Sequence, residues 1–357
     1  MHIEKIELHN FRNYSNLELE FSKNVNLILG KNAQGKTNLL EAVYLTAIGR
    51  SFRTSKDIDL VKFNENNSIV KVWAEKELNS TTVEISIKRK GEKSSEKFIK
   101  KDKKNVTRTS QLLKNILIVI FSPEDLKIVK DEPEKRRKFI DRELSQISPK
   151  YYNSLSNYKK SLLQRNTYLK EENLEPSIID IWDVQLSKYG AEVIFLREKF
   201  IEKLSEYSSK IHSGITGGKE KLDILYEPNV EIKQSLSEQE DFIYSELKNS
   251  FKTDSRNRNT SVGPHRDDIL FVVNDIDMRN FGSQGQQRTC ALSLKLAELN
   301  LIKEKTDEDA ILLLDDVMSE LDADRQEFLI DTMKNNQLFI TTTELDQNIK
   351  DKFKELK

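Results

Sequence analysis

The sequence predicts an α/β protein in which the two ends of the chain build a mixed sheet and a helical second domain is inserted between them. Three observations carry this prediction. A glycine-rich loop, Gly30–Thr37, separates an apolar run from a helical stretch. Segments near both ends of the chain alternate apolar and polar residues, as half-buried strands do. From Pro133 onward the apolar residues recur every three or four positions, which is the period of a helix.

Composition and charge narrow the class of protein. The 357 residues suggest about two domains, and 58 basic against 59 acidic residues leave a net charge of −1. Any nucleic-acid partner must therefore be held by a local patch of charge. The single cysteine, Cys290, excludes a disulfide framework and a cysteine-based metal site. The charged N-terminus lacks an apolar signal core and no apolar run could span a bilayer, so we expect a soluble cytoplasmic protein without membrane association.

The glycine-rich loop has the form G-x-x-x-x-G-K-T, with a predicted strand at Val25–Leu29 before it and a predicted helix at Asn38–Tyr44 after it. Its two glycines let the backbone curl so that N–H groups point at a phosphate near a helix N-terminus. Lys36 can reach the terminal phosphates, and the Thr37 hydroxyl can ligate Mg²⁺. The sequence therefore predicts a nucleoside triphosphate site formed by Gly30, Lys31, Asn32, Ala33, Gln34, Gly35, Lys36 and Thr37.

Strands are predicted throughout the first third of the chain, from alternation or from one continuous apolar run: His2–Leu8, Leu17–Phe21, Ser68–Ala74, Thr81–Lys88 and Ile116–Phe121. Between Lys88 and Arg108 the basic residues exceed the acidic ones by seven. Such a run is usually a solvated face, and contact with a DNA backbone is the alternative reading.

Two long helices are predicted in the middle of the chain. Apolar residues mark one face of the first, and a stripe from Leu186 to Ile211 marks the second in steps of three and four. The polar connection Glu171–Pro176 between them is short, so the two helices are expected to pack as an antiparallel pair.

A further strand is predicted at Ile269–Val273, after the helical stretch. We use the change from helices back to strands to divide the chain into domains. We assign residues 1–130 and 261–357 to a head, domain I, and residues 131–260 to a helical insert, domain II. Within the second part of the head, Ser283–Arg288 opens an amphipathic helix.

An apolar run, Ile311–Leu314, ends in Asp315 and Asp316. Behind a phosphate loop, the first carboxylate is expected to hold Mg²⁺ together with Thr37, and the second to orient or deprotonate the attacking water. The sequence thus predicts Lys36, Asp315 and Asp316 as the catalytic residues.

The phosphate loop, the helix start Ser283–Arg288 and the Asp315-Asp316 pair together resemble the ABC-type ATPase heads of the SMC-like superfamily. In those heads the Ser-x-Gly-Gln helix start of one subunit closes over the γ-phosphate held by the other subunit. The resemblance implies ATP and Mg²⁺ in a site shared by two copies, with three residues contacting ATP in trans: Ser283, Gly285 and Gln286. A helix N-terminus suits an anion, which agrees with this role.

The sequence is similar over nearly its whole length to the bacterial RecF family. The residues that carry the similarity are Asn10–Tyr14, Gly30–Thr37, Gly49–Arg53, Arg136–Asp141, Gly263–Asp268, Ser283–Arg288 and Asp315–Asp322. The resemblance implies a DNA-binding ATPase of recombinational repair that acts on single-stranded or gapped DNA with the RecO and RecR mediators. It also implies ATP-dependent homodimerisation, slow DNA-stimulated hydrolysis, and support of replication and the SOS response.

Some residue roles come from the resemblance alone. Arg12 and Asn13 match family positions near the nucleotide, and Arg50 or Arg53 matches a phosphate sensor. Asp322 matches a residue of the dimer seam.

At two places the sequence differs from general ABC heads in a way that affects the expected rate of ATP hydrolysis. Asp316 stands where most heads carry glutamate, and Thr341–Thr343 stand where a switch histidine is common. We therefore expect ATP to act mainly as a switch that closes a clamp.

Two other functions are compatible with these motifs. One is an ABC-type ATPase subunit that drives a membrane or protein partner without binding DNA, although transporter heads carry their signature nearer the phosphate loop. The other is a nuclease-linked ATPase of the overcoming-lysogenisation type, which would need an acidic, metal-binding nuclease domain after the head.

Overall fold

The computed structural model describes residues 1–31, 33–77, 79–91, 94–107 and 111–343. The predicted loop residue Asn32 lies outside this set. The chain forms two compact units: unit 1 comprises Met1–Leu126 and Lys295–Lys357, and unit 2 comprises Lys127–Leu294.

Unit 1 contains a six-stranded sheet in which every neighbouring pair is antiparallel. Its strands alternate buried and exposed residues, so one face is apolar. The order across the sheet is β2 (Tyr14–Glu20), β1 (His2–Phe11), β4 (Asn67–Glu75), β5 (Ser80–Arg89), β6 (Ser95–Lys101) and β7 (Lys104–Asn105).

A second sheet of unit 1 is parallel and joins the two ends of the chain. Its order is β3 (Val25–Leu29), β13 (Leu338–Thr342), β12 (Ile311–Asp315) and β8 (Ile118–Phe121). Parallel and antiparallel pairing therefore occur in two separate sheets. The inner strands of the parallel sheet, β12 and β13, are buried along their whole length and begin with apolar residues.

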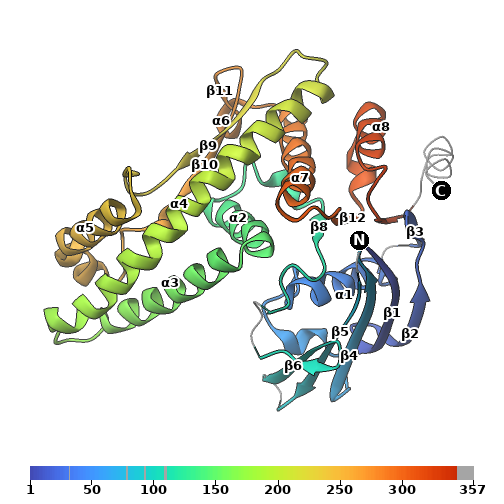
Figure 1. The fold of residues 1–357 in the computed structure, drawn as a ribbon, viewed down its shortest axis with the longest axis horizontal. Coiled ribbons are helices and arrows are strands. Elements are labelled where there is room, and N and C mark those ends of the chain that lie inside the picture. The colour runs from blue at the N-terminus through green and yellow to red at the C-terminus, as the bar shows by residue number, and fades with distance from the viewer. Residues whose placement is uncertain (32, 78, 92–93, 108–110, 344–357) are drawn as a thin grey trace. The chain divides into compact units, whose positions relative to one another are not determined.

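Helix α1 (Lys36–Ile48) holds the two sheets of unit 1 together. Its apolar side chains belong to one core cluster with residues of β1, β4, β5, β8, β12 and β13. Figure 1 shows α1 beside the strands β1, β4 and β5. The phosphate loop that precedes α1 thus runs from the half-buried β3 into a buried helix.

Shorter elements complete unit 1. They are η1 (Asp57–Leu60), η3 (Asp125–Lys127, whose last residue belongs to unit 2), η5 (Val317–Glu320) and α8 (Ala323–Thr332).

Unit 2 is built on the helices α2 (Pro133–Ile147), α3 (Pro149–Tyr168) and α4 (Pro176–Ile215). Each begins at a proline, whose ring fixes a helical φ and whose missing N–H is no loss in a first turn. The long helices α3 and α4 lie side by side in Figure 1. Ser161 bonds Gln185, whereas Arg165, one turn later in α3, bonds Asp183, which lies earlier in α4. The two helices are therefore antiparallel, as predicted.

Unit 2 also contains a small sheet, β11 (Ile276–Asp277), β10 (Asp268–Val273) and β9 (Leu222–Glu227), which the prediction of a helical domain did not include. The helix α5 (Leu236–Asn257) and the short η4 (Pro264–Arg266) and α6 (Met278–Phe281) lie between and after these strands in sequence.

The observed boundary between the units differs from the predicted division at residue 260. Strand β10 pairs with β9 over its whole length, so residues 261–294 group with unit 2. The chain passes into unit 1 within α7 (Gln284–Thr306). Among the described residues, no helix combines the length and apolar character that a membrane span requires.

Candidate active site

The phosphate loop leaves β3 at Leu29 and enters α1 at Lys36. Gly35 has φ of 102°, a conformation that side-chain-bearing residues rarely adopt. A Cβ atom at Gly35 would also lie 2.6 Å from Asn13 Nδ2. Only glycine fits this position, which exposes the backbone at the start of α1 as an anion cradle requires.

Lys36 bends back over the loop that it follows. Its Nζ donates hydrogen bonds to the carbonyl oxygens of Gly30, at 2.7 Å, and Lys31, at 3.3 Å. The side chain is 7% exposed. An ammonium whose hydrogen-bond partners among the described residues are carbonyl groups suits a ligand that brings negative charge, such as a triphosphate.

Thr37 and Asp315 meet although they are 278 positions apart: Thr37 Oγ1 donates to Asp315 Oδ1 at 2.8 Å. The carboxyl ends of parallel strands lie at one edge of a sheet, and the loop after β3 and the end of β12 therefore come together. Two oxygen groups at this distance fit a hard cation such as Mg²⁺. The predicted metal residues are thus brought together.

Thr341 contacts both acidic residues at the end of β12, a role that the sequence did not predict. Its hydroxyl donates to Asp315 Oδ1 at 2.8 Å and lies 3.0 Å from the backbone nitrogen of Asp316, which donates to it. The sequence offered only the position of Thr341, at the end of the last apolar strand.

Asp316 follows the strand in a left-handed conformation, with φ of 54°. Burial raises the pKa of its carboxyl group and the neighbouring Lys36 charge opposes this rise, while Asp315 adds to it. A carboxylate with a raised pKa beside a phosphate loop can accept a proton from water.

Arg12 and Arg53 are both held by Glu41, a fully buried residue of α1. Arg12 donates from Nε and Nη2 to the two carboxylate oxygens, at 2.8 and 2.6 Å, and Arg53 Nη1 lies 3.4 Å from Glu41 Oε2. Glu41 was not among the predicted site residues. A lone acid inside the apolar helix was the signal that could have identified it.

Asn13 ties the β1–β2 turn to the phosphate loop. Its Nδ2 donates to the Gln34 carbonyl at 3.3 Å, and its Oδ1 accepts from Asn38 at 2.8 Å. Arg53 donates to the Asn38 side chain at 2.7 Å. Arg12, Asn13 and Arg53 therefore belong to one network around the loop, whereas Arg50 is exposed.

In unit 2, Ser283 and Gln286 form a reciprocal cap at the start of α7. Ser283 Oγ accepts from the Gln286 backbone nitrogen at 3.2 Å, and Gln286 Oε1 accepts from the Ser283 backbone nitrogen at 3.1 Å. Gln286 Nε2 also donates to Glu220 Oε1 at 2.9 Å, and Glu220 Oε2 lies 3.0 Å from His212 Nε2. Gly285 stands inside this first turn.

Asp322 caps α8 in unit 1, because its Oδ1 accepts from the Arg325 backbone nitrogen at 3.0 Å. This contact accounts for the residue locally, and its predicted place in a dimer seam stays a prediction.

Two motifs without a predicted role, Arg136–Asp141 and Gly263–Asp268, meet inside unit 2. Arg136 binds Asp268 through two hydrogen bonds, at 2.6 and 2.7 Å. The fully buried Arg197 bonds both Asp141, at 2.8 Å, and Asp267, at 2.7 Å. These contacts tie α2, α4 and the η4 turn together.

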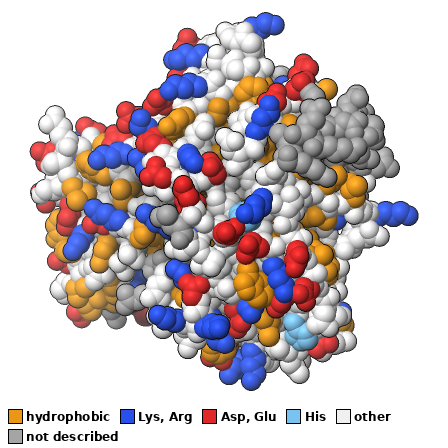
Figure 2. Space-filling view, turned by 45° about the vertical axis from the view of Figure 1, so that its right-hand side comes forward, with side chains coloured by type: hydrophobic (Ala, Val, Ile, Leu, Met, Phe, Trp, Pro, Cys, Tyr) orange, Lys and Arg blue, Asp and Glu red, His pale blue; other side chains and the backbone are white. Residues whose placement is uncertain are grey.

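The strands β5, β6 and β7 carry the run of basic residues that begins at Lys88, and we call them the basic hairpin. More of its lysines form ion pairs than the sequence suggests. Lys97 Nζ donates to the Gly49 carbonyl, at 2.8 Å, and forms an ion pair with Asp57. Lys100 pairs with Glu84, whereas Lys103 and Lys104 are exposed. On the face shown in Figure 2, basic and acidic side chains are intermixed.

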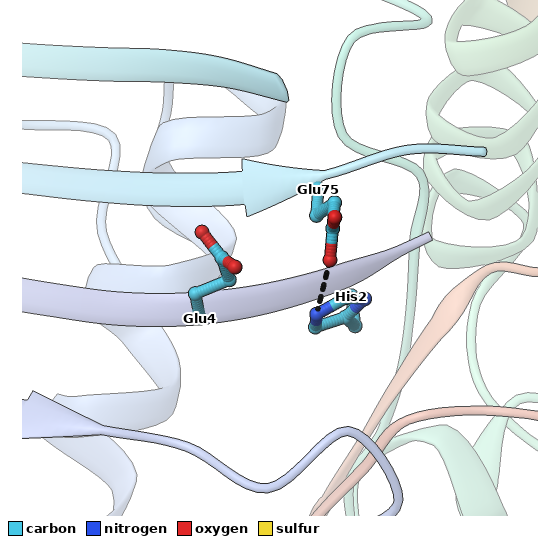
Figure 3. Close-up of side chains that lie close together, drawn as sticks. All are labelled: His2, Glu4 and Glu75. Atoms are coloured by element: carbon cyan, nitrogen blue, oxygen red, sulfur yellow. Dashed lines mark ion pairs between the residues drawn. The ribbon is translucent and has the colours of Figure 1, made fainter. Parts of the chain in front are cut away.

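A cluster of His2, Glu4 and Glu75 lies where β1 and β4 pair (Figure 3). His2 Nε2 lies 3.1 Å from Glu75 Oε2, and Lys23 Nζ lies 3.3 Å from the same oxygen. Burial and the Lys23 charge lower the pKa of His2. The Lys23 ammonium supplies the cation that the Glu75 carboxylate needs, so these contacts are explained as ion pairing.

Comparison with known proteins places the whole chain in one group. Residues 2–355 match the model described as RecF/RecN/SMC N terminal domain. The chain is 44% identical over 352 residues to the DNA replication and repair protein RecF of Clostridium tetani, covering 98% of this chain and 95% of that protein. It is 42% identical over 356 residues to the protein of the same name from Agathobacter rectalis, covering 99% and 95%.

A solved structure described as the recombination mediator protein RecF-ATP in the RecFOR pathway superposes on this chain with a TM-score of 0.89. The identity is 40%, and the match covers 97% of this chain and 92% of that chain.

Proposed function

Because this chain belongs to the RecF family, we propose that it is an ATP-dependent DNA-binding protein of recombinational repair. It would bind single-stranded or gapped DNA, work with RecO and RecR in the cytoplasm, and serve DNA replication and SOS induction. The observation that supports the proposal best is the 2.8 Å hydrogen bond from Thr37 to Asp315, because it joins the phosphate loop to the acidic strand end.

Bound ATP with Mg²⁺ would supply the phosphoanhydride bond and the charge around which two copies close. The backbone at the start of α1 and the Lys36 ammonium would bind the phosphates. Thr37 and Asp315 would offer oxygen ligands to the metal. Asp316 would accept a proton from water, and its side chain, one methylene shorter than glutamate, is consistent with weak, DNA-stimulated hydrolysis that opens the clamp.

The dimeric part of the proposal rests on Ser283, Gly285 and Gln286, which would contact the nucleotide of the other copy. The cap between Ser283 and Gln286 fixes the first turn of α7, so its N–H groups have a defined direction. Arg12 and Asn13 would lie near the nucleotide, and Asp322 at the seam.

Retention on a gapped duplex at moderate salt, with ATP or ADP, tests this function. We expect retention with ATP, and loss of retention in Lys36→Ala with the fold intact by circular dichroism. Lys334→Ala, which removes an exposed lysine paired with Asp331, is the matched control and should behave as wild type. ATP hydrolysis without DNA retention would instead favour an ABC-type subunit for a protein or membrane partner.

Ser283→Arg tests the shared site by light scattering with a non-hydrolysable ATP analogue. The bulky cation should block dimerisation and leave ATP binding by the monomer near normal. Ser283→Ala removes only the cap, at a cost of about 1 kcal/mol in stability, and separates capping from steric exclusion. Dimerisation of the arginine variant would show that the ATP site is self-contained.

A further inference from the structure

A cavity of about 300 Å³ in unit 2 lies between α2, α3, α4 and the η4 turn. Its α2 wall is formed by residues at positions i, i+3, i+4 and i+7, which share one helix face: Glu134, Arg137, Lys138 and Asp141. The opposite walls carry the side chains of Tyr158, Lys159, Arg197 and His265. The size suits a small ligand group.

Arg137 is the unusual member of this wall. Its Nη1 donates to the Asp267 backbone carbonyl at 2.6 Å, and among the described residues it forms no ion pair with a carboxylate. Burial and the neighbouring Arg197 charge lower the pKa of Arg137, and the nearby carboxylates of Asp268, Asp267 and Glu134 oppose this shift. The guanidinium is therefore a half-buried cation that lines the cavity together with Lys138, Lys159 and Arg197.

The acidic groups that line the cavity are paired directly with cations other than Arg137. Asp141 accepts from Arg197 and from Lys159, each at 2.8 Å. Glu134 pairs with Lys138 at 2.6 Å, where both side chains are largely exposed.

The remaining groups form no direct ion pair with Arg137 either. The carboxylate of Asp267 is bound to Arg197 at 2.7 Å and to Tyr226. His265 Nε2 lies 2.9 Å from the Thr260 carbonyl, which only an N–H can approach so closely, so Nδ1 accepts from the Tyr158 hydroxyl at 2.7 Å. Burial lowers the pKa of His265 to about 4, so this side chain is neutral. Among the described residues that line the cavity, Arg137 is thus a cation without a direct carboxylate partner.

We propose that this cavity binds a phosphate group, held by the guanidinium of Arg137 and the ammonium of Lys138. The Nε–H and Nη2–H groups of a guanidinium match two oxygens of a phosphate, and a nearby lysine adds charge without fixed geometry. A nucleic-acid backbone and inorganic phosphate both carry this group. Binding of a nucleic-acid backbone in this cavity rests on the DNA binding proposed above, whereas binding of inorganic phosphate does not depend on it.

The first experiment uses inorganic phosphate alone. Thermal unfolding of the full chain is followed in sodium phosphate and in sodium chloride of equal ionic strength, for wild type, Arg137→Gln and Lys135→Gln. Lys135 lies on the same helix outside the cavity and pairs with Asp131, so it is matched in charge and location. Phosphate should raise the Tm of wild type and of the Lys135 variant but not that of the Arg137 variant.

The second experiment measures DNA affinity against salt concentration. Loss of one phosphate contact should reduce the slope of log K against log salt by about 0.7 to 0.9 and weaken binding about tenfold. Arg137→Gln should show this change, Lys138→Gln a smaller one, and Lys135→Gln none. Lys138 is exposed, so its variant reports on binding without a risk to folding.

The outcomes separate the two sources. A reduced slope assigns the site to a nucleic-acid backbone, and phosphate stabilisation with an unchanged slope assigns it to a free anion. The proposal is overturned if phosphate stabilises all variants equally and the DNA slopes of the Arg137 and Lys138 variants match that of wild type. If wild type fails to bind DNA, the proposed function fails and the phosphate experiment still decides the site.

Discussion

The phosphate-loop region of unit 1 and the charged network of unit 2 are both assembled from distant motifs, but their buried cations have different partners. In unit 2, buried Arg197 meets two carboxylates, from Asp141 and Asp267. In unit 1, Lys36 is also buried, yet its hydrogen-bond partners in the described chain are carbonyl groups. A buried charge bonded directly to carboxylates holds a fold together, whereas a buried charge whose hydrogen-bond partners are carbonyl groups marks a place for a ligand.

The largest expected effect lies at Asp316. Asp316→Asn removes the proton acceptor and should slow ATP hydrolysis by roughly 10²–10⁴, while ATP binding persists because Lys36, Thr37 and Asp315 are untouched. The closed dimer should then dissociate more slowly from a gapped duplex after a competitor chase in ATP, but not in ADP. Asp315→Asn is the comparison variant and should weaken Mg²⁺-dependent closure itself. Equal dissociation of Asp316→Asn and wild type in ATP would mean that hydrolysis does not open the clamp.

Arg197→Ala tests whether the charged network of unit 2 stabilises the fold. Removing this cation leaves Asp141 and Asp267 as buried carboxylates without their shared partner, so the free energy of unfolding should fall by about 3–5 kcal/mol. Urea unfolding measures the change. Lys199→Ala, at an exposed position of the same helix, should alter stability by less than about 0.5 kcal/mol. A similarly small loss in the Arg197 variant would show that packing, and not the ion network, stabilises this region.

The pH dependence of stability follows from His265. Burial lowers the pKa of folded His265 to about 4 from its ordinary value of 6.5, so the unfolded chain binds more protons between these pH values. Stability should therefore fall by about 3 kcal/mol as the pH drops from 6.5 to 4, and this contribution should be constant above 6.5. Unfolding free energies measured across this range test the sign. His265→Asn, which cannot titrate, should flatten the slope, and an unchanged slope would assign the effect to other groups.

The smallest effect is expected on the basic hairpin of unit 1. Lys103→Gln and Lys104→Gln remove exposed charges, and each lost DNA phosphate contact should lower the salt slope of binding by about one unit. Lys97→Gln is the control, because that ammonium is paired with Asp57 and its loss should affect stability and leave the slope unchanged. If the slope stays constant in all three variants, the hairpin is a solvated face.

The local features of this protein could be predicted from the sequence by itself. The loop Gly30–Thr37, the alternating strands and the pair α3–α4 each depend on residues within a few positions of one another, and spacing of that kind is visible in a linear chain. The same holds for the Asp315-Asp316 pair, because an apolar strand ending in acids is a local pattern. The proximity of Asp315 to Thr37 was an inference from the motif, and the structure shows that contact.

Only the tertiary structure decided which groups meet. The pairing of β9 with β10 moved residues 261–294 into unit 2, and strand pairing depends on the competition among all strands of the chain. The salt bridge between Glu41 and Arg12, the Thr341 contact with Asp315 and the hydrogen bond from Arg137 to the Asp267 carbonyl likewise arise from long-range packing. Whether a charged side chain is paired depends on what the fold places within a few ångströms of it, and residue type and spacing do not contain that distance.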